Sequence, residues 1–237
     1  MTVIDLIKAH IQTGSVCHWI LREFYHSPTR FAFALGRSLI CTKMLTGRYW
    51  PIQVRVAAGQ KFRVHCSPSQ KVQLKGILSV IHWGGLDSPS SLTLGAESRF
   101  VLLGDFEVGP GVHILVSPRA LLKIAGRLNA SASGITCNTR IMVEDSVEIG
   151  HDSIIAWDVY ISDSNWHDIK GVQKIAPVSI GSNVWISHGV SILRGVTIPS
   201  RCIVGAKSLV TSVIGFERAL IAGIPATVRK TGVEWSR

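Results

Sequence analysis

Aliphatic residues recur every six positions over the last quarter of the chain. The positions that follow this period are Ile180, Ile186, Ile192, Ile198, Val204 and Val210. A six-residue period matches neither the 3.6-residue α-helix nor the two-residue alternation of a simple strand. It is typical of short flat strands wound into a stacked coil, in which each side of a prism contributes one inward aliphatic side chain. The pattern therefore predicts an all-β fold, a parallel β-helix.

A second set of positions supports this prediction. A small or β-branched residue follows each aliphatic position by four, at Val184, Val190, Val196, Cys202, Ser208 and Ile214. Upstream, the period is clear at Ile149, Ile155 and Ile161 and less regular at Ile135, Ile141, Val108 and Ile114. Stacking such coils aligns the inward residues into internal ladders, so we expect the coil to occupy most of the chain.

The two ends of a β-helix expose unpaired strand edges, so both need caps. Residues 3–12 and 16–26 carry apolar residues at helical spacing and are predicted to be helices that cap the first coil. We divide the chain into a basic, partly helical capping region (residues 1–60), the β-helix (61–215) and a C-terminal tail (216–237).

The six-residue period breaks once in the regular part of the chain. Ile180 lies 19 positions after Ile161, which is not a multiple of six, and the segment between them is polar and contains Gly171 and Pro177. A loop over residues 162–179 is therefore predicted to leave the coil. Functional residues are frequent on loops that a rigid scaffold holds out.

The stretch "VSIGSNVWISHGVSILRGVTIPSRCIVGAKSLVTSVIGFERALIAGIPATVRK" (residues 178–230) resembles the hexapeptide-repeat acyltransferases, which include galactoside, maltose and polysaccharide O-acetyltransferases. The resemblance is specific over residues 130–230 and looser over 76–130. It implies a left-handed parallel β-helix with three hexapeptides per coil, assembled as a homotrimer. It also implies transfer of an acetyl group from acetyl-CoA to a sugar hydroxyl.

Acetyl transfer to a hydroxyl needs a base, and a histidine is suited to this at neutral pH. His167 matches the family's base, a histidine at the start of an extruded loop one coil before the sequence "V-W-I". Asp163 and Asn165 are candidates to orient its ring or to bind the acceptor; the alternative is a polar turn that ends the strand.

Two tryptophans are candidates for substrate contact. Trp185 matches the aromatic residue of "V-W-I" and could form an apolar platform or fill a trimer interface, and Trp166 adjoins the base. His188 stands where the family usually has glycine, and we expect it to face solvent.

The coenzyme half of the site is assigned by the resemblance to the last coils. Small residues there would let backbone amides approach the pantetheine arm, and basic residues would meet the phosphates. The candidate coenzyme residues are Gly205, Ala206, Lys207, Ser208, Ala222, Gly223, Pro225, Arg229 and Lys230. The sequence departs from the family at Ile224 and Thr227, which puts side-chain contacts from those two positions in doubt.

The net charge of +10 is concentrated at the ends of the chain. Residues 1–75 carry 11 Lys and Arg against 2 Asp and Glu, interleaved with aromatic residues. This mixture suits peripheral contact with an anionic membrane, although the same side chains could simply cap the coil and face water. No nucleic-acid-binding module is recognisable, so we expect no nucleic acid partner.

The cysteines and histidines restrict where the protein is expected to act and whether it is expected to bind a metal. Five cysteines without a C-x-x-C pair indicate reduced thiols, and no signal peptide is visible, so we expect a cytoplasmic protein, peripheral at most to the inner membrane face. The histidines of the repeat lack the close pair that a zinc site on this fold would need, so no metal is expected.

A bacterial surface polysaccharide, such as capsule or lipopolysaccharide O-antigen, is the expected acceptor. An N-acyltransferase for a nucleotide-linked amino sugar and a non-catalytic binding protein remain alternatives.

Overall fold

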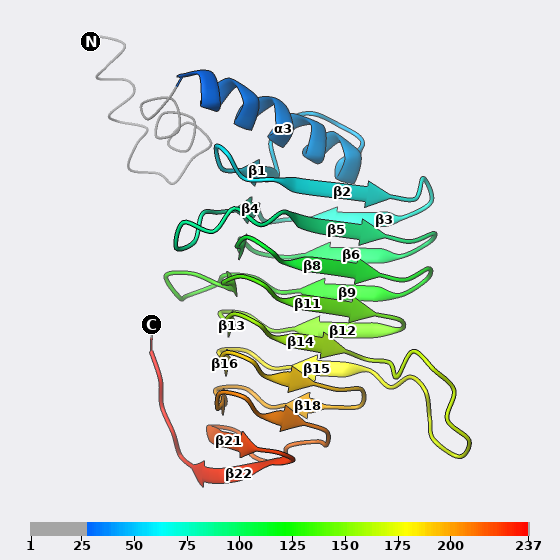
Figure 1. The fold of residues 1–237 in the computed structure, drawn as a ribbon, viewed down its shortest axis with the longest axis vertical. Coiled ribbons are helices and arrows are strands. Elements are labelled where there is room, and N and C mark those ends of the chain that lie inside the picture. The colour runs from blue at the N-terminus through cyan, green and yellow to red at the C-terminus, as the bar shows by residue number, and fades with distance from the viewer. Residues whose placement is uncertain (1–27, 237) are drawn as a thin grey trace.

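Three parallel sheets form the sides of a long three-sided coil (Figure 1). The computed structural model of the chain describes residues 28–236, so the helices predicted at residues 3–12 and 16–26 lie outside the described residues. Sheet A is made of β1 (Val54–Val56), β4 (Leu78–Val80), β7 (Phe106–Val108), β10 (Gly134–Ile135), β13 (Ile154–Ile155), β16 (Trp185–Ile186), β19 (Ile203–Val204), β21 (Ala219–Gly223) and β22 (Ala226–Thr231). Sheet B is made of β2 (Phe62–Cys66), β5 (Ser90–Leu94), β8 (His113–Val116), β11 (Arg140–Val143), β14 (Tyr160–Ser162), β17 (Ser191–Ile192) and β20 (Leu209–Val210). Sheet C is made of β3 (Lys71–Leu74), β6 (Arg99–Leu102), β9 (Leu121–Ile124), β12 (Ser146–Ile149), β15 (Val178–Ile180) and β18 (Thr197–Ile198).

The predicted inward residues form the core of this coil. All six positions of the regular period, from Ile180 to Val210, are at most 2% exposed, and five of the six positions four residues later are equally buried. Within sheet B the register runs from Ile141 to Ile161, Ile192 and Val210, so equivalent aliphatic side chains stack directly on one another. The prediction of a left-handed parallel β-helix is confirmed.

A helix covers the N-terminal end of the coil. Helix α3 (Pro28–Thr46) lies across β1, and Cys41 and Leu45 join the buried core. Two buried hydroxyls of α3 accept hydrogen bonds from the edge strand: the amide of Val56 donates to Ser38 Oγ at 2.9 Å and the amide of Val54 donates to Thr42 Oγ1 at 3.1 Å. The helix therefore supplies acceptors that a further strand would otherwise provide.

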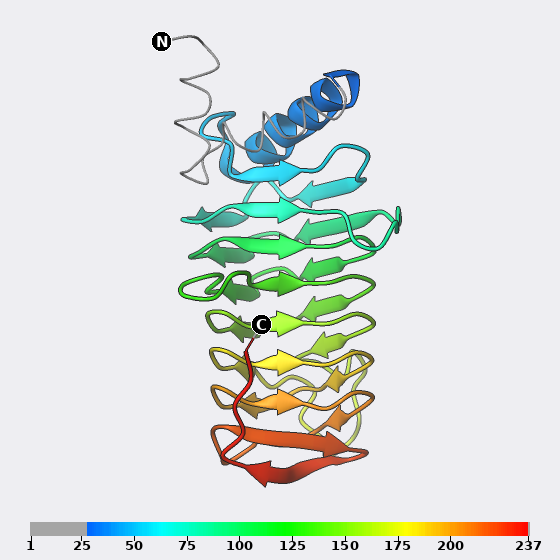
Figure 2. The same cartoon turned by 90° about the vertical axis from the view of Figure 1, so that its left-hand side faces the viewer.

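The opposite end of the coil is closed by a reversal of the chain. The parallel ladder of sheet A continues to β21, wider than the 61–215 range at both ends, and β22 then pairs antiparallel with β21. The C-terminal segment returns along sheet A (Figure 2), where Trp235 Nε1 donates to the carbonyl of Asn183 at 3.0 Å.

Three excursions leave the coil, one at each corner of the prism. Residues 81–89 connect sheet A to sheet B, residues 126–133 connect sheet C to sheet A, and residues 163–177 connect sheet B to sheet C. The last of these projects furthest from the coil (Figure 1) and coincides with the predicted extruded loop. Within the described part of the chain, no helix combines the length and apolar character that a membrane span requires.

Candidate active site

The extruded loop begins as a short hairpin that its own backbone holds together. The amide of Asn165 donates to the carbonyl of Lys174 at 3.0 Å, and the amide of Ala176 donates to the carbonyl of Asp163 at 2.9 Å. Isolated bridges join Ser164 to Ile175 and, nearer the tip, Ile169 to Val172. His167 lies between these two bridges, with its side chain exposed.

Asp163 anchors this hairpin to the preceding coil. Its side chain is fully buried, and its two carboxylate oxygens accept hydrogen bonds from the amides of Glu144, Asp145 and Ser146 at 2.6–2.8 Å. Burial raises the pKa of the Asp163 carboxyl, and the amide donors offset part of that rise. The carboxylate thus fixes the base of the loop to the turn between β11 and β12.

Glu144 on the same turn makes a second attachment. Its carboxylate accepts a hydrogen bond from Ser164 Oγ and forms an ion pair with Lys174 Nζ at 3.5 Å. Ser164 and Lys174 belong to opposite arms of the hairpin, so one carboxylate holds both arms against the coil. The loop is therefore positioned by buried contacts at its base.

Trp166 sets the direction in which the next residue points. It has a positive φ of 61°, its amide donates to Ser164 Oγ at 2.9 Å, and its indole Nε1 donates to Ser162 Oγ at 3.2 Å. The indole is folded back onto the loop base, and His167 follows it outward. In the described part of the chain, no hydrogen bond joins His167 to Asp163 or Asn165, so these candidates are close in sequence without forming one hydrogen-bonded unit.

The candidate coenzyme residues do come together, at the corner between sheets A and B. Ser208 Oγ donates to the carbonyl of Gly205 at 2.6 Å and accepts from the amide of Gly223 at 3.2 Å. Arg229 Nε donates to the carbonyl of Ala222 at 2.9 Å. Two segments far apart in sequence are thus joined into one surface of small residues beside a guanidinium.

Gly223 has a specific place in this surface. Its φ is +115°, and a Cβ atom there would lie 2.6 Å from Arg229 Nη2, so a larger residue would displace the guanidinium. Ile224, Pro225 and Lys230 are exposed next to it. The group of small residues and basic side chains fits the amide-rich arm and the phosphates of a coenzyme A thioester.

Lys207 lies on the same corner. It has a positive φ of 60°, and its amide donates to the carbonyl of His188 one coil earlier at 2.9 Å. Its Nζ lies 2.9 Å from the place where a Cβ of Gly189 would be, so the lysine side chain runs over that glycine along the coil axis.

An aromatic pair that the sequence analysis missed lies on the same corner as Lys207, in the preceding coils. The rings of Trp157 and His188 are stacked with centroids 5.3 Å apart and planes 14° apart. Because Ile155, Ile186 and Val204 are register partners, the residues two positions later, Trp157, His188 and Ala206, occupy the same corner in successive coils. The six-residue period relates His188 to Ala206, 18 positions later, but the inserted loop breaks the period between Trp157 and His188. His188, which was expected to face solvent, is partly exposed and stacks on Trp157 at this corner.

Trp185 lies on sheet A rather than beside the loop. It is 41% exposed and packs against Trp235 at 6.1 Å between centroids, with the planes tilted by 48°. The C-terminal segment of the same chain therefore covers part of the platform that the sequence predicts.

Two further observations concern possible metal ligands and thiols in the described residues. No group of three His, Cys, Asp or Glu side chains there is placed to hold a metal ion. Burial raises the pKa of the Cys41 and Cys66 thiols to about 11, which keeps them protonated at neutral pH.

Comparison with known proteins gives three informative similarities, and no family model matches. Galactoside O-acetyltransferase of Escherichia coli (strain K12) is 27% identical over 184 residues, which are 75% of this chain and 88% of that protein. WbbJ of the same organism, whose name assigns it to lipopolysaccharide biosynthesis as an O-acetyl transferase, is 36% identical over 100 residues, 36% of this chain and 50% of that protein. The solved structure of the polysialic acid O-acetyltransferase OatWY is 19% identical, with a TM-score of 0.46 over 74% of this chain and 88% of that chain.

The hexapeptide coil and the alignment with galactoside O-acetyltransferase over most of both chains point in the same direction. The chain is similar to the hexapeptide-repeat acetyltransferases. Its loop that carries His167 leaves the corner between sheets B and C, whereas the small-residue surface lies at the corner between sheets A and B. The two candidate halves of the site are thus separated by the width of sheet B within one chain.

Proposed function

We propose that this protein moves an acetyl group from acetyl-CoA to a hydroxyl of a sugar, on a bacterial surface polysaccharide such as capsule or lipopolysaccharide O-antigen or on its precursor. The single observation that carries the proposal is the small-residue surface built by Gly205, Ser208, Ala222 and Gly223 on a hexapeptide coil. The names of the similar proteins, which refer to galactoside, lipopolysaccharide and polysialic acid, support a sugar as the acceptor.

The axial positions of the two half-sites support a shared reaction centre. Trp157 immediately precedes β14 and the His167 loop immediately follows it, so both belong to the same coil. The coenzyme surface at Ala222 lies three ladder spacings further along sheet A, at about 4.8 Å each, or about 14 Å. An extended thioester arm that starts at Ala222 and follows the corner past Ala206 and His188 would end at the level of the loop.

Because the half-sites lie on different corners, we further propose that the active unit is a homotrimer. Three-fold symmetry about an axis parallel to the coil keeps axial levels equal between subunits. It would therefore bring the His167 loop of one protomer to the Trp157–His188 column of its neighbour. The exposed, self-supported hairpin is suited to reach across such an interface.

In the proposed reaction the neutral imidazole of His167 accepts the proton of the acceptor hydroxyl as its oxygen bonds to the thioester carbon. The carbon–sulfur bond then breaks, and the departing thiolate takes that proton back from the imidazolium. Asp163 and Glu144 act by positioning the loop, since the Asp163 carboxylate binds amides of the preceding coil and the Glu144 carboxylate binds Ser164 of the loop. Lys207, Arg229 and Lys230 would neutralise the phosphates of the donor. Trp166 and Trp185 stay as predicted acceptor contacts, and Asn165 as a predicted orienting group.

The exposed face of α3 favours a location at a membrane surface. Phe33, Arg37, Ile40 and Met44 share one face of α3, where Phe33 is 81% and Ile40 57% exposed, and Lys43 is exposed nearby. We propose that this apolar and basic face rests on an anionic lipid surface, where each basic residue contributes about 1 kcal/mol. The full chain should co-sediment with phosphatidylserine vesicles at low salt and be released near ~0.5 M salt. An Ile40→Ser/Met44→Ser variant should bind less; an unaltered chain that stays in solution at low salt would refute the contact.

The direct test of the function compares surface polysaccharide from cells with and without the protein by mass spectrometry. We expect acetyl esters to disappear from the polysaccharide when the protein is absent and to return when the purified protein is supplied with labelled acetyl-CoA. Label in an amide instead of an ester would show transfer to an amino sugar. Polysaccharide acetylation that is independent of the protein would overturn the proposed acceptor.

A further inference from the structure

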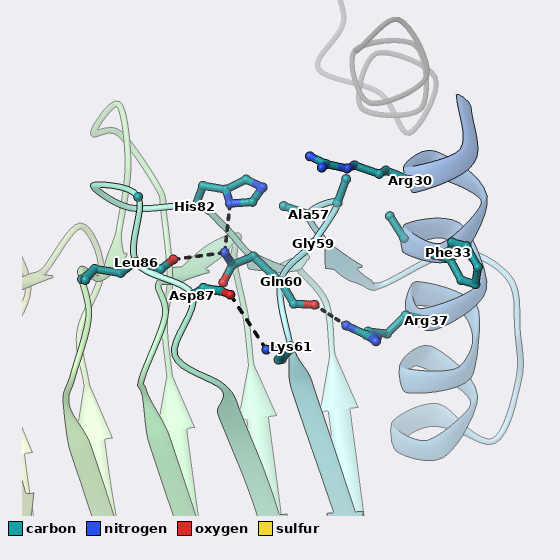
Figure 3. Close-up of a pocket in the computed structure, with 13 residues that line it drawn as sticks. Arg30, Phe33, Arg37, Ala57, Gly59, Gln60, Lys61, His82, Leu86 and Asp87 are labelled. Atoms are coloured by element: carbon teal, nitrogen blue, oxygen red, sulfur yellow. Dashed lines mark hydrogen bonds and ion pairs between the residues drawn. The ribbon is translucent and has the colours of Figure 1, made fainter. Parts of the chain in front are cut away.

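A second cavity lies at the other end of the coil, between α3 and the first excursion. It has a volume of about 550 Å³, and Arg30, Phe33, Arg37, Gln60, Lys61 and His82 are among its lining residues (Figure 3). It is at the corner between sheets A and B, at the level of β2, whereas Ser208 immediately precedes β20 in the same sheet. Six ladder spacings of about 4.8 Å, or about 29 Å, separate these strands, so the cavity is not part of the acetyl-transfer site.

The described lining of this cavity is positively charged. It contains Arg30, Arg37 and Lys61 but one carboxylate, that of Asp87, and the first turn of α3 contains no acidic residue. The ion pair of Lys61 with Asp87 is long, at 3.9 Å, and both side chains are more than half exposed, so it neutralises little of the lysine charge. Figure 3 shows the Arg30 side chain directed toward His82 across the cavity.

A buried amide fixes the hydrogen-bonding state of His82. Gln60 is 2% exposed, and its Nε2 lies 2.9 Å from His82 Nδ1 and 3.4 Å from the carbonyl of Leu86. Because an amide nitrogen is only a donor, His82 Nδ1 is the acceptor, and the proton of the neutral ring is on Nε2. In this arrangement the Nε2–H of His82 is a donor on the side opposite Gln60.

The same amide leaves an acceptor without a donor. Gln60 Oε1 is buried and accepts no hydrogen bond from any residue that the structure describes. A buried amide oxygen normally has a donor, and the absence of one is costly. The cavity itself offers an accessible acceptor, the Asp87 carboxylate, which suits a hydroxyl-bearing ligand.

We propose that the cavity between α3 and the first coils binds a phosphorylated polyol, that is, a sugar phosphate or a glycerophosphate head group. The cations and the His82 N–H hold the phosphate, since charge-assisted hydrogen bonds to phosphate are strong. The Asp87 carboxylate accepts hydrogen bonds from the hydroxyls. The cavity falls within the size range of small-molecule sites. Arg37 also donates to the backbone carbonyl of Gln60, which couples α3 to the turn that carries the buried amide.

The test uses the full chain, glucose 1-phosphate and inorganic phosphate in titration calorimetry, with a matched pair of variants. A Lys61→Gln/His82→Gln variant removes two phosphate donors, and Arg63→Gln removes an exposed cation two residues further on, outside the cavity. We expect glucose 1-phosphate to bind more tightly than inorganic phosphate, because only the sugar supplies hydroxyls. The double variant should weaken this binding at least about tenfold and Arg63→Gln less than about twofold.

Vesicles separate the two sources of the phosphate. Displacement of phosphatidylglycerol vesicles from the full chain by glucose 1-phosphate would assign the site to a lipid head group, and binding of the sugar phosphate without vesicle binding would assign it to a soluble ligand. The absence of saturable binding of glucose 1-phosphate, or equal loss in the double variant and in Arg63→Gln, would overturn the proposal. Shifts of the His82 ring resonances in the unaltered chain test the contact independently of variant folding. Acetyl transfer by the double variant should be unchanged, so failure of this proposal is distinguishable from failure of the proposed reaction.

Discussion

The rings of Trp157 and His188 stack 5.3 Å apart, although the whole extruded loop lies between them in the sequence. The stack is a consequence of register, because Ile155 pairs with Ile186 and each aromatic residue follows two positions later. It places a flat aromatic surface immediately above the small-residue surface at Ala206, on the same corner of the coil.

This relationship makes a kinetic prediction for Trp157. If the donor arm runs along the corner, Trp157→Ala should raise the KM for acetyl-CoA by about fivefold, because an aromatic contact contributes on the order of 1 kcal/mol. Steady-state kinetics with varied acetyl-CoA check this. Trp83→Ala, which removes a similarly exposed indole in the first excursion, is the control and should leave that KM unchanged. Equal KM values in the two variants would contradict the assigned path.

His167 should control turnover without controlling donor binding. His167→Ala is expected to lower kcat by at least ~100-fold, the loss typical of a general base, and to leave acetyl-CoA affinity unchanged. His113→Ala, which removes an exposed imidazole on β8, serves as the control. Turnover near that of the unaltered protein in the His167 variant would remove this residue from the mechanism.

Asp163 should act through the position of the loop. Asn in its place keeps the shape but turns one acceptor oxygen into a donor that faces the amides of residues 144–146, so Asp163→Asn should lower the free energy of unfolding by about 1–3 kcal/mol. Asp168→Asn, on the exposed part of the loop, should change it by less than about 0.5 kcal/mol. Urea unfolding of both variants measures the difference. If the two variants unfold alike, Asp163 does not anchor the loop.

A site shared between neighbouring chains can be tested by complementation between two inactive variants. When His167→Ala chains are co-expressed in equal amounts with Gly223→Trp chains, which block the coenzyme surface, about a quarter of the interfaces in random trimers contain both intact halves. We therefore expect about a quarter of the full activity from two inactive variants. Complementation that fails while the mixed trimers form would show that each site is complete within one chain.

The raised thiol pKa values predict slow alkylation. With a pKa of about 11, only about 0.1% of the Cys66 thiol is thiolate at pH 8, against roughly a quarter of a free cysteine with a pKa of 8.5. Iodoacetamide should therefore modify Cys66 at least ~100-fold more slowly in the folded chain than in urea, and the rate should rise as the pH approaches 11. Mass spectrometry of the Cys66 peptide measures both rates; equal rates would contradict the assigned environment.

The sequence was sufficient for the coil because each inward residue repeats at a fixed spacing. Ile180 to Val210 predicted the buried ladders, and the break after Ile161 predicted the loop that carries His167. Contacts between coils were harder to foresee. The partners of Asp163 are backbone amides of the previous coil, and backbone amides leave no trace in the residue types. The Trp157–His188 stack depends on register across the inserted loop, whose length hides the equivalence of the two positions.

The way in which the N-terminal helix α3 contacts the coil could not be predicted from hydrophobic spacing. Helix α3 contacts the coil partly through the polar residues Ser38 and Thr42, and its exposed face keeps Phe33 and Ile40. A pattern of apolar positions does not distinguish such a helix from a solvent-exposed one, because the contacts that orient α3 on β1 are hydroxyl groups.

Those two hydroxyls also affect whether a further strand can add to the N-terminal end of the coil. A stack of identical coils is in principle a one-dimensional polymer, in which every edge strand is a template for the next strand. Ser38 and Thr42 accept the edge amides of Val56 and Val54 with side chains, and a helix offers no backbone ladder to an incoming strand. The cap therefore satisfies edge amides of β1, in the first coil, and in the same contact leaves no place there for a further strand. Two side-chain oxygen atoms thus protect the N-terminal edge of sheet A against pairing with another chain.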